Sequence, residues 1–201
     1  LTPIRRIPLD PDEKDYLGRF LDVTKSQLFF SKGVILVEGI SEALLLPIFA
    51  DIMGQEFNLN QLGIEVVNIG GVAFKPFAKL FISNTTTERL NVNCSIITDD
   101  DSNSPRAQNA RNLTGGRLKV FLSSNTFEYE LYFQNESVIS ETYRQMHPQF
   151  NLNSGDINSK ATQFMKKIKS NKDKAIFAQI LAEKLKSGTI VFNVPAYIQN
   201  A

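Results

Sequence analysis

Gly33-Val-Ile-Leu-Val-Glu-Gly39 is the most informative stretch of this sequence. Its four apolar residues run without a break and include β-branched side chains, a pattern typical of a strand buried on both faces. A similar run farther along, Cys94-Ser-Ile-Ile-Thr98, leads into Asp99-Asp100-Asp101. Both runs end in carboxylates, and ligands of an open parallel sheet bind at the carboxyl ends of its strands. If the two strands are neighbours, their acids converge on one spot.

Short apolar runs alternate with helical patterns through the first part of the chain. We predict strands at 33–38, 64–69, 94–98 and 118–122, and helices at 41–53 and 74–83. This alternation indicates an α/β fold with a mostly parallel central sheet flanked by helices. The polar segment 100–117, which contains Pro and Gly, is expected to be a long loop over the site.

The two ends of the chain have a different pattern. Asp10 or Asp12 is expected to cap a lead-in helix that continues to about Leu28. Residues 126–147 and 172–187 have helical spacing and are separated by a polar stretch. We therefore expect three parts, namely a linker with the lead-in helix, an α/β core, and a C-terminal helical appendage with further site residues: 1–30, 31–125 and 126–201.

The composition excludes several kinds of site. With a net charge of +1, the chain has no broad basic field, so contact with nucleic acid needs a local patch. Cys94 is the single cysteine, which excludes an internal disulfide and a cysteine zinc cluster and fits a reducing cytoplasm. The single histidine, His147, is too little for a histidine-based metal site and is expected on a helix surface. No apolar run approaches the roughly 20 residues that cross a bilayer, so no membrane contact is expected.

Several sequence blocks resemble a known family. The Gly33–Gly39 block, the following Ser41-Glu-Ala-Leu-Leu-Leu-Pro47 and Asp99-x-Asp101 resemble the Toprim domain of topoisomerases, primases and some nucleases. More narrowly, the chain resembles the nuclease half of the overcoming-lysogenization-defect (OLD) family, which includes the nuclease subunit of Gabija-type antiphage systems. The blocks that support the narrower match lie in order over about 20–200: 29–32, 67–74, 126–131, 174–178 and 194–198.

The resemblance implies a Toprim fold and an endonuclease activity. It also implies an ATP-binding cassette-type ATPase domain in front of the Toprim part. No G-x-x-x-x-G-K-[ST] phosphate-binding motif occurs in this chain, and the Gly70-Gly71 pair is a turn signal. Because the chain begins at Leu1, we expect it to be part of a longer protein whose ATPase domain lies elsewhere.

The acids that end the two strands are the first candidate ligands. Glu38 follows a buried strand, and Gly39 beside it is expected to permit a sharp turn and to leave room for a phosphate. Glu42 either gains from the dipole of the following helix or joins Glu38 at the same end of the sheet. Asp99 and Asp101 point the same way if the backbone is extended, while Asp100 points away. The alternative for the three aspartates is a turn or a helix cap.

Glu128 and Glu130 are further candidate ligands. The spacing Asn125-x-x-Glu128 is that of a capping box, in which Glu128 would only satisfy backbone donors at a helix start. The residues alone leave this reading and the metal-ligand reading open. The resemblance of 126–131 to a family block favours Glu128 as a ligand of a second metal ion, with Glu130 as its less favoured partner.

Lys174 is the candidate basic residue of the site. A lysine at a helix start opposes the helix dipole, and Lys172 shares this position, so a solvated pair is the ordinary reading. The resemblance implies instead that Lys174 reaches the active site and contacts the phosphate or the transition state. A nearby cluster is expected at the surface, where it could touch the DNA backbone: Lys166, Lys167 and Lys169.

Together these residues predict a metal-dependent DNA endonuclease. The expected catalytic residues are Glu38, Asp99 and Lys174, and the expected ligands are Glu38, Glu42, Asp99, Asp101, Glu128 and Glu130. They would hold two Mg²⁺ ions, with Mn²⁺ as a substitute, about 3.5–4 Å apart, as in other two-metal sites. The expected partners are DNA, the ATPase domain and a helicase. The alternative is a non-catalytic Toprim-like module that docks a partner ATPase or helicase.

Overall fold

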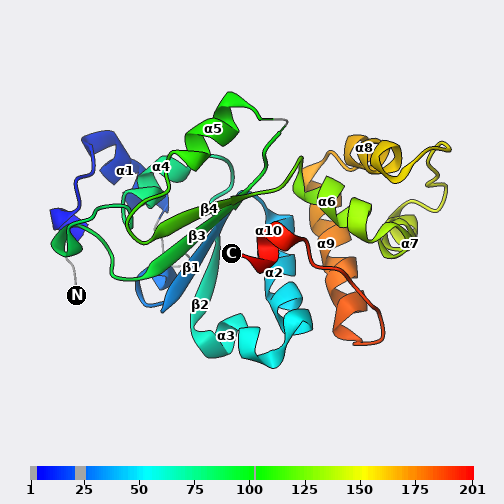
Figure 1. The fold of residues 1–201 in the computed structure, drawn as a ribbon, viewed down its shortest axis with the longest axis horizontal. Coiled ribbons are helices and arrows are strands. Elements are labelled where there is room, and N and C mark those ends of the chain that lie inside the picture. Colours follow the sequence, from blue (N-terminus) through cyan, green and yellow to red (C-terminus); the bar gives the residue numbers. More distant parts are fainter. Residues whose placement is uncertain (1–3, 21–25, 102) are drawn as a thin grey trace.

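A sheet of four parallel strands forms the centre of the protein. We describe residues 4–20, 26–101 and 103–201 of a computed structural model of the chain. The strands follow the order β2-β1-β3-β4 (Figure 1). They are β1 (Gly33–Val37), β2 (Ile64–Asn68), β3 (Asn93–Thr98) and β4 (Leu118–Leu122). The predicted parallel sheet is confirmed, and β1 and β3 are neighbours with Val37 opposite Ile97.

Helices cover both faces of this sheet. Alternate strand residues such as Val34 and Leu36 belong to a core shared with α1 (Pro11–Phe20) and α4 (Phe74–Ala78). Val37 and Ile97 face the other side, towards α2 (Ile40–Met53). α5 (Pro105–Arg111) lies with α4 and lines a pocket with it.

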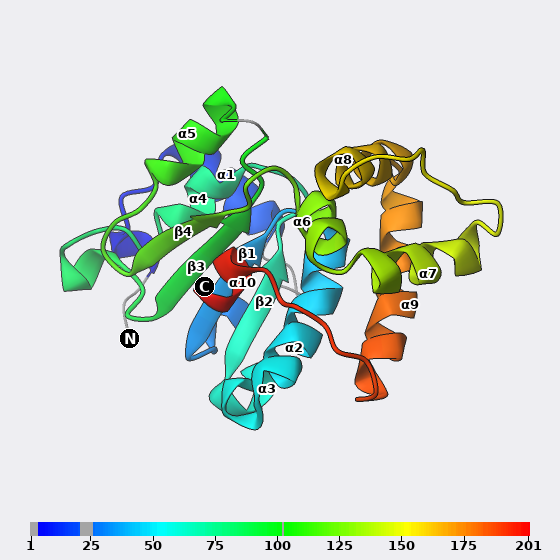
Figure 2. The same ribbon diagram turned by 45° about the vertical axis from the view of Figure 1, so that its right-hand side comes forward.

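A group of four helices extends beyond α2. They are α6 (Phe127–Gln134), α7 (Glu136–Met146), α8 (Ile157–Lys167) and α9 (Asn171–Lys186). α9 packs along α2, and α6 packs on α8 (Figure 2). The helices and the sheet share one apolar core, in which Phe127 and Phe177 join Val37 and Ile97. A C-terminal helical part beside the sheet is therefore present, as the sequence predicts.

The C-terminal tail leaves this helical group and returns to the sheet. After α9 the chain crosses α2 and ends in the short helix α10 (Ala196–Gln199), which contacts β4 (Figures 1 and 2). The hydroxyl of Ser95 in β3 donates to the carbonyl of Ala201 at 2.6 Å. The last residues of the expected appendage thus pack on the α/β core, while the boundary at 125/126 stays a prediction.

Some helix predictions are wrong. The helix expected over 74–83 ends at Ala78, and the loop expected over 100–117 contains α5. Ser104 caps α5 by accepting from the Ala107 amide at 3.2 Å, and Pro105 occupies the first helical turn, where a proline needs no amide hydrogen.

Two further corrections concern the C-terminal helices. The helix expected over 126–147 is interrupted at Asn135, where the side-chain amide donates to the Leu131 and Asn193 carbonyls at 3.2 and 3.0 Å. The polar stretch 148–171 contains α8, which Asp156 caps by accepting from the Ser159 amide at 2.8 Å.

Short elements complete the described chain. They are α3 (Leu59–Leu62) and 3-10 turns at Ile4–Arg6, Ser26–Phe29, Gln55–Phe57 and Thr86–Glu88. The lead-in helix predicted to reach Leu28 ends its described part at Phe20, and 21–25 lie outside the described residues. Cys94 is buried in β3, and His147 is exposed at the end of α7, both as predicted. No helix in the described ranges is long and apolar enough to cross a membrane.

Candidate functional site

Glu38 lies where β1 ends and is held by its neighbours in β3. The Thr98 hydroxyl and the Asp99 amide, the latter at 3.3 Å, both donate to Glu38 Oε1. The Gly71 amide donates to the Glu38 carbonyl at 2.9 Å, in a turn where Gly70 and Gly71 both have positive φ. The neighbouring strand and the glycine turn therefore fix this carboxylate at the carboxyl end of the sheet.

Asp99 joins the sheet to the helical part of the molecule. Its Oδ1 accepts from the Phe127 amide at 2.8 Å, at the start of α6, and from the Ser123 hydroxyl at 3.3 Å. Burial raises the pKa of Asp99 to about 8, and the charges of Glu128, Glu42 and Glu38 add to this effect. Asp99 is therefore a half-buried acid surrounded by other acids.

Glu42 reaches the same place from the first turn of α2. Burial raises the pKa of Glu42 to about 7, and Glu128 and Glu38 raise it further. A Cβ atom at Gly39 would lie 3.0 Å from Glu42 Oε2. The sharp turn expected at Gly39 is wrong, because its φ of −137° is open to any residue. Glycine here gives room to the Glu42 carboxylate.

Asp100 and Asp101 face arginines of α5. Asp101 has a φ of 46°, so the extended backbone that would align it with Asp99 is absent. Its carboxylate pairs with Arg106, whose guanidinium is also 3.9 Å from Glu38 Oε2. Asp100 pairs with Arg111. Both of these aspartates therefore have arginine partners, and the role of Asp101 as a ligand stays a prediction.

Glu128 makes an ion pair and forms no capping box. Thr126 caps α6 by accepting from the Tyr129 amide at 3.2 Å, which leaves Glu128 free to meet Lys174 Nζ at 2.8 Å. Burial alone lowers the pKa of Lys174, but Glu128, with Glu42 and Asp99, raises it overall. Lys174 is therefore part of the acidic cluster and carries its charge there.

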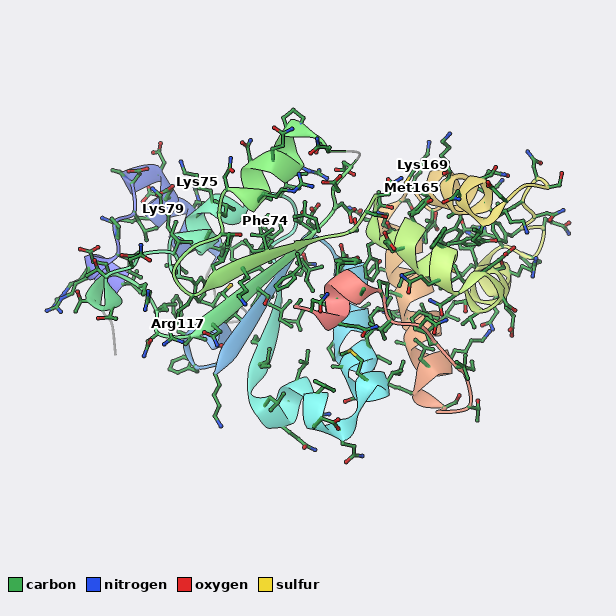
Figure 3. All side chains as sticks on the ribbon, in the orientation of Figure 1. Phe74, Lys75, Lys79, Arg117, Met165 and Lys169 are labelled. Carbon is green, nitrogen blue, oxygen red and sulfur yellow. The ribbon has the colours of Figure 1, made fainter. Side chains whose placement is uncertain are left out.

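The other basic residues near Lys174 are exposed. The Ser41 hydroxyl donates to the Lys174 carbonyl at 3.2 Å and so fixes the start of α9 to α2. Lys172 lies in the solvent, as do Lys166, Lys167 and Lys169 at the end of α8 (Lys169 is labelled in Figure 3). Their predicted surface position is confirmed, and their contact with DNA stays a prediction.

Glu130 is engaged differently from the other acids. Its Oε1 accepts from the amide of Ser124 at 3.0 Å and from the hydroxyl of the same residue. These bonds give Glu130 a structural reason to be buried. Its role as a ligand stays a prediction.

The donor set fits a divalent cation in its chemistry. Glu38, Glu42, Asp99 and Glu128 supply the oxygen ligands that Mg²⁺ prefers, and their charges act on one another. Within the described ranges, however, no three His, Cys, Asp or Glu side chains are already placed to hold one ion. Binding would therefore require side chains to move, first of all Arg106, which occupies the space between Asp101 and Glu38.

Two residues of this site were not predicted as site residues. Arg106 comes from a helix inside a segment that was expected to be a loop. Tyr197 comes from the returning tail, and Asp99, Glu42, Glu130 and Glu128 all act electrostatically on its hydroxyl. The sequence signal for Tyr197 was its place in the family-like block 194–198, and a signal for Arg106 was the Ser104-Pro105 start of α5.

Comparisons with known proteins agree with this geometry. A family model described as overcoming lysogenization defect protein-like, TOPRIM domain, matches residues 29–101, which include Glu38, Glu42 and Asp99. Among solved structures, the chain is similar to the C-terminal region of the Xanthomonas campestris pv. campestris OLD protein. The two are 28% identical with a TM-score of 0.62, over 87% of this chain and 92% of that one. A search of curated proteins found no match.

A second solved structure supports the fold alone. The C-terminal region of the Burkholderia pseudomallei OLD protein is 23% identical, with a TM-score of 0.58 over 85% of this chain and 94% of that one. A nuclease-type function is consistent with these matches. The sheet, the position of its acids and the two kinds of match lead to one conclusion. Residues 29–101 of this chain form an OLD-like Toprim domain, and the chain as a whole is similar to the C-terminal region of an OLD protein.

Proposed function

We propose that the chain is the catalytic region of a metal-dependent DNA endonuclease. The observation that carries this proposal is the missing positive charge beside Glu42 and Asp99. Glu42 is buried and Asp99 is half-buried, and neither forms an ion pair with a lysine or arginine among the residues described. Carboxylates that are shielded from water and repel one another are costly unless a proton or a cation neutralises them. Two Mg²⁺ ions, or Mn²⁺ in their place, would supply this charge.

The side chains around the cluster have separable roles. When bound, divalent ions would activate the attacking water and neutralise charge on the phosphate. Glu38 and Asp99 are held by backbone and hydroxyl donors and would provide the fixed ligands. Glu42, Asp101, Glu128 and Glu130 would complete the set. Lys174 would place a positive charge against the phosphate where the negative charge grows in the transition state.

The surface near the site offers places for a DNA backbone. A pocket of about 530 Å³ beside the acids is lined by Thr98, Arg106 and Lys75, among others. The exposed lysines at the end of α8, Lys166, Lys167 and Lys169, lie in another part of the surface. Lys75 and Lys169 are well separated in Figure 3. The proposal also includes an ATPase domain of the same protein, a helicase partner, a cytoplasmic location and a role in antiphage defence.

Plasmid nicking by the chain tests the function. We expect supercoiled plasmid to be nicked with Mg²⁺ or Mn²⁺ and to stay intact with EDTA. Asp99→Asn keeps an oxygen for the Phe127 amide but loses the charge, so nicking should fall to background while the fold is kept. The matched control is Asp100→Asn, which changes an acid that pairs with Arg111 and should retain activity. Cleavage by Asp99→Asn at the parent's rate would refute the site.

One observation favours a second candidate function. Arg106 and Lys174 already neutralise Glu38, Asp101 and Glu128, as they would in a purely structural acidic cluster. The chain would then be a scaffold that docks an ATPase or a helicase. The same assay separates the two candidates, because a scaffold would nick no plasmid with any divalent ion.

A further inference from the structure

The C-terminal tail places a tyrosine at the acidic cluster. Ala201 is bonded to Ser95 in the middle of β3, and Ile198 and Ala201 line one apolar pocket together with Ser95 and Ile97. Because alternate residues of a strand share a face, Ser95 and Ile97 lie on the same side of β3 and lead towards Asp99. Tyr197 is one helical turn before Ala201. Its hydroxyl lies close enough to Asp99, Glu42, Glu130 and Glu128 for these acids to act on it electrostatically, which puts it near the carboxyl end of β3.

The hydroxyl of Tyr197 is buried and lacks a partner. Within the described part of the chain, no hydrogen-bond donor or acceptor reaches it. The tyrosines of the helical part are satisfied: Tyr132 bonds to Ser140 Oγ at 3.0 Å, and Tyr129 donates to Asn158 Oδ1 at 2.9 Å. Buried phenol groups usually find such a partner. The groups that act on Tyr197 are carboxylates, with Asp99 first and Glu42 second.

We propose that Tyr197 is a positioning residue of the cation site. When a divalent cation draws the carboxylates together, the Tyr197 hydroxyl donates to one of them, Asp99 in the first place. Asp99 has an oxygen to offer, since the Phe127 amide and the Ser123 hydroxyl both use Oδ1. Such a bond would fix the Asp99 carboxylate for the cation, as outer partners of metal ligands do. This inference rests on the proposed function.

The surroundings of Tyr197 suit a donor and exclude a nucleophile. Burial, and then Asp99 and Glu42, raise the pKa of Tyr197 well above its usual value. The phenol therefore keeps its proton at neutral pH, and an attack by phenolate is disfavoured. A protonated phenol that faces carboxylates can only donate to them.

Mn²⁺ binding to the chain tests this inference. Free Mn²⁺ is measured by electron paramagnetic resonance for the parent, for Tyr197→Phe and for the control Tyr129→Phe, whose hydroxyl bonds to Asn158. We expect the affinity of Tyr197→Phe to be about tenfold weaker, within the range typical for loss of an outer partner. The affinity of Tyr129→Phe should be unchanged. The melting temperature of cation-free Tyr197→Phe should equal or exceed that of the parent, because its hydroxyl has no partner to lose.

Terbium luminescence adds a test of position. The chain has no tryptophan, so light absorbed by tyrosine is the source of sensitised Tb³⁺ emission. Tyr197→Phe should lose most of this emission, while emission excited directly at the ion persists. Equal Mn²⁺ affinity, undiminished sensitised emission, or a lower melting temperature of cation-free Tyr197→Phe would overturn the inference alone. A parent that binds neither ion would overturn the proposed function and this inference with it.

Discussion

The outer and inner acids at the end of β3 differ in what neutralises them. Asp100 and Asp101 lie on the α5 side and pair with Arg111 and Arg106 of that helix. Asp99, next to them in sequence, instead accepts from the Phe127 amide of α6 and has no cationic partner within the described ranges; nor has Glu42. Three consecutive aspartates are therefore not equivalent. The difference shows where positive charge is missing, and so where a cation would gain most.

The inner acids lie where the sheet meets the helical part. Asp99 accepts a hydrogen bond from the first amide of α6. Glu42 lies in the first turn of α2, the helix along which α9 packs. Among the described residues, Lys174 of α9 is the one cation that pairs with an acid of this region, and its partner is Glu128. Once Glu42 and Asp99 are ionised, one lysine against Glu42, Asp99 and Glu128 leaves a net negative charge. The following predictions test whether the inner acids act in catalysis while the outer acids do not.

The largest effect is expected for the inner cation Lys174. Lys174→Ala should lower the single-turnover rate of DNA cleavage by on the order of 10² to 10³, with little change in DNA affinity, as expected for a charge that acts in the transition state. Lys172→Ala changes an exposed lysine of the same turn and should be nearly silent. Because Lys174→Ala leaves Glu128 buried without its partner, rates should be compared well below the melting temperature of the variant. Equal rates for Lys174→Ala and the parent would end the catalytic interpretation.

The strands and the acids that follow them show how much of the fold and the site can be predicted from the sequence. Runs of apolar, β-branched residues predict the central strands β1 and β3, because burial on both faces of a parallel sheet demands them, whereas the edge strands β2 and β4 each contain a charged residue. The convergence of Glu38 and Asp99 follows, since parallel strands end at the same edge. The local sequence is thus enough to predict the position of a residue, such as Glu38 or Asp99, that directly follows a buried strand.

Long-range packing sets the features that the sequence does not predict. The left-handed backbone of Asp101 and its pairing with Arg106 depend on where α5 packs, which no local pattern describes. The Asn135 break depends on the Asn193 carbonyl, far along the chain. Tyr197 reaches the acids only because the tail returns to β3. The helix start at Asp156 was a local signal that the polar composition of its segment obscured.

A moderate effect is expected from pH on the cation-free protein. The folded pKa values are about 7 for Glu42 and about 8 for Asp99, against ordinary values of 4.5 and 3.8. The folded state therefore holds more protons than the unfolded state across this window. Its stabilisation is fully present below pH 4 and is lost as the pH rises through 7 to 8.

Melting temperatures in EDTA should consequently fall by several degrees between pH 5 and pH 8.5. Asp99→Asn should flatten this fall, while Asp100→Asn, an outer acid, should keep it. Mg²⁺ should bind more tightly as the pH rises over the same window, because the ion displaces the protons of the inner acids. A parent whose melting temperature rises from pH 5 to pH 8.5 would contradict the buried, mutually repelling arrangement.

The smallest effect is expected for the outer arginine Arg106. Its guanidinium competes with a cation for Asp101 and Glu38, so Arg106→Ala should tighten Mg²⁺ binding. Partly exposed ion pairs contribute about 0.2–1 kcal/mol, which corresponds to a gain in affinity of at most about fivefold. Arg111→Ala, which frees Asp100 and the Asn103 side chain, should leave the affinity unchanged. Weaker Mg²⁺ binding by Arg106→Ala in calorimetry would mean that Arg106 organises Asp101 and Glu38 as ligands. In that case outer and inner acids would form one cation site, and the proposal that only the inner acids bind the cation would be wrong.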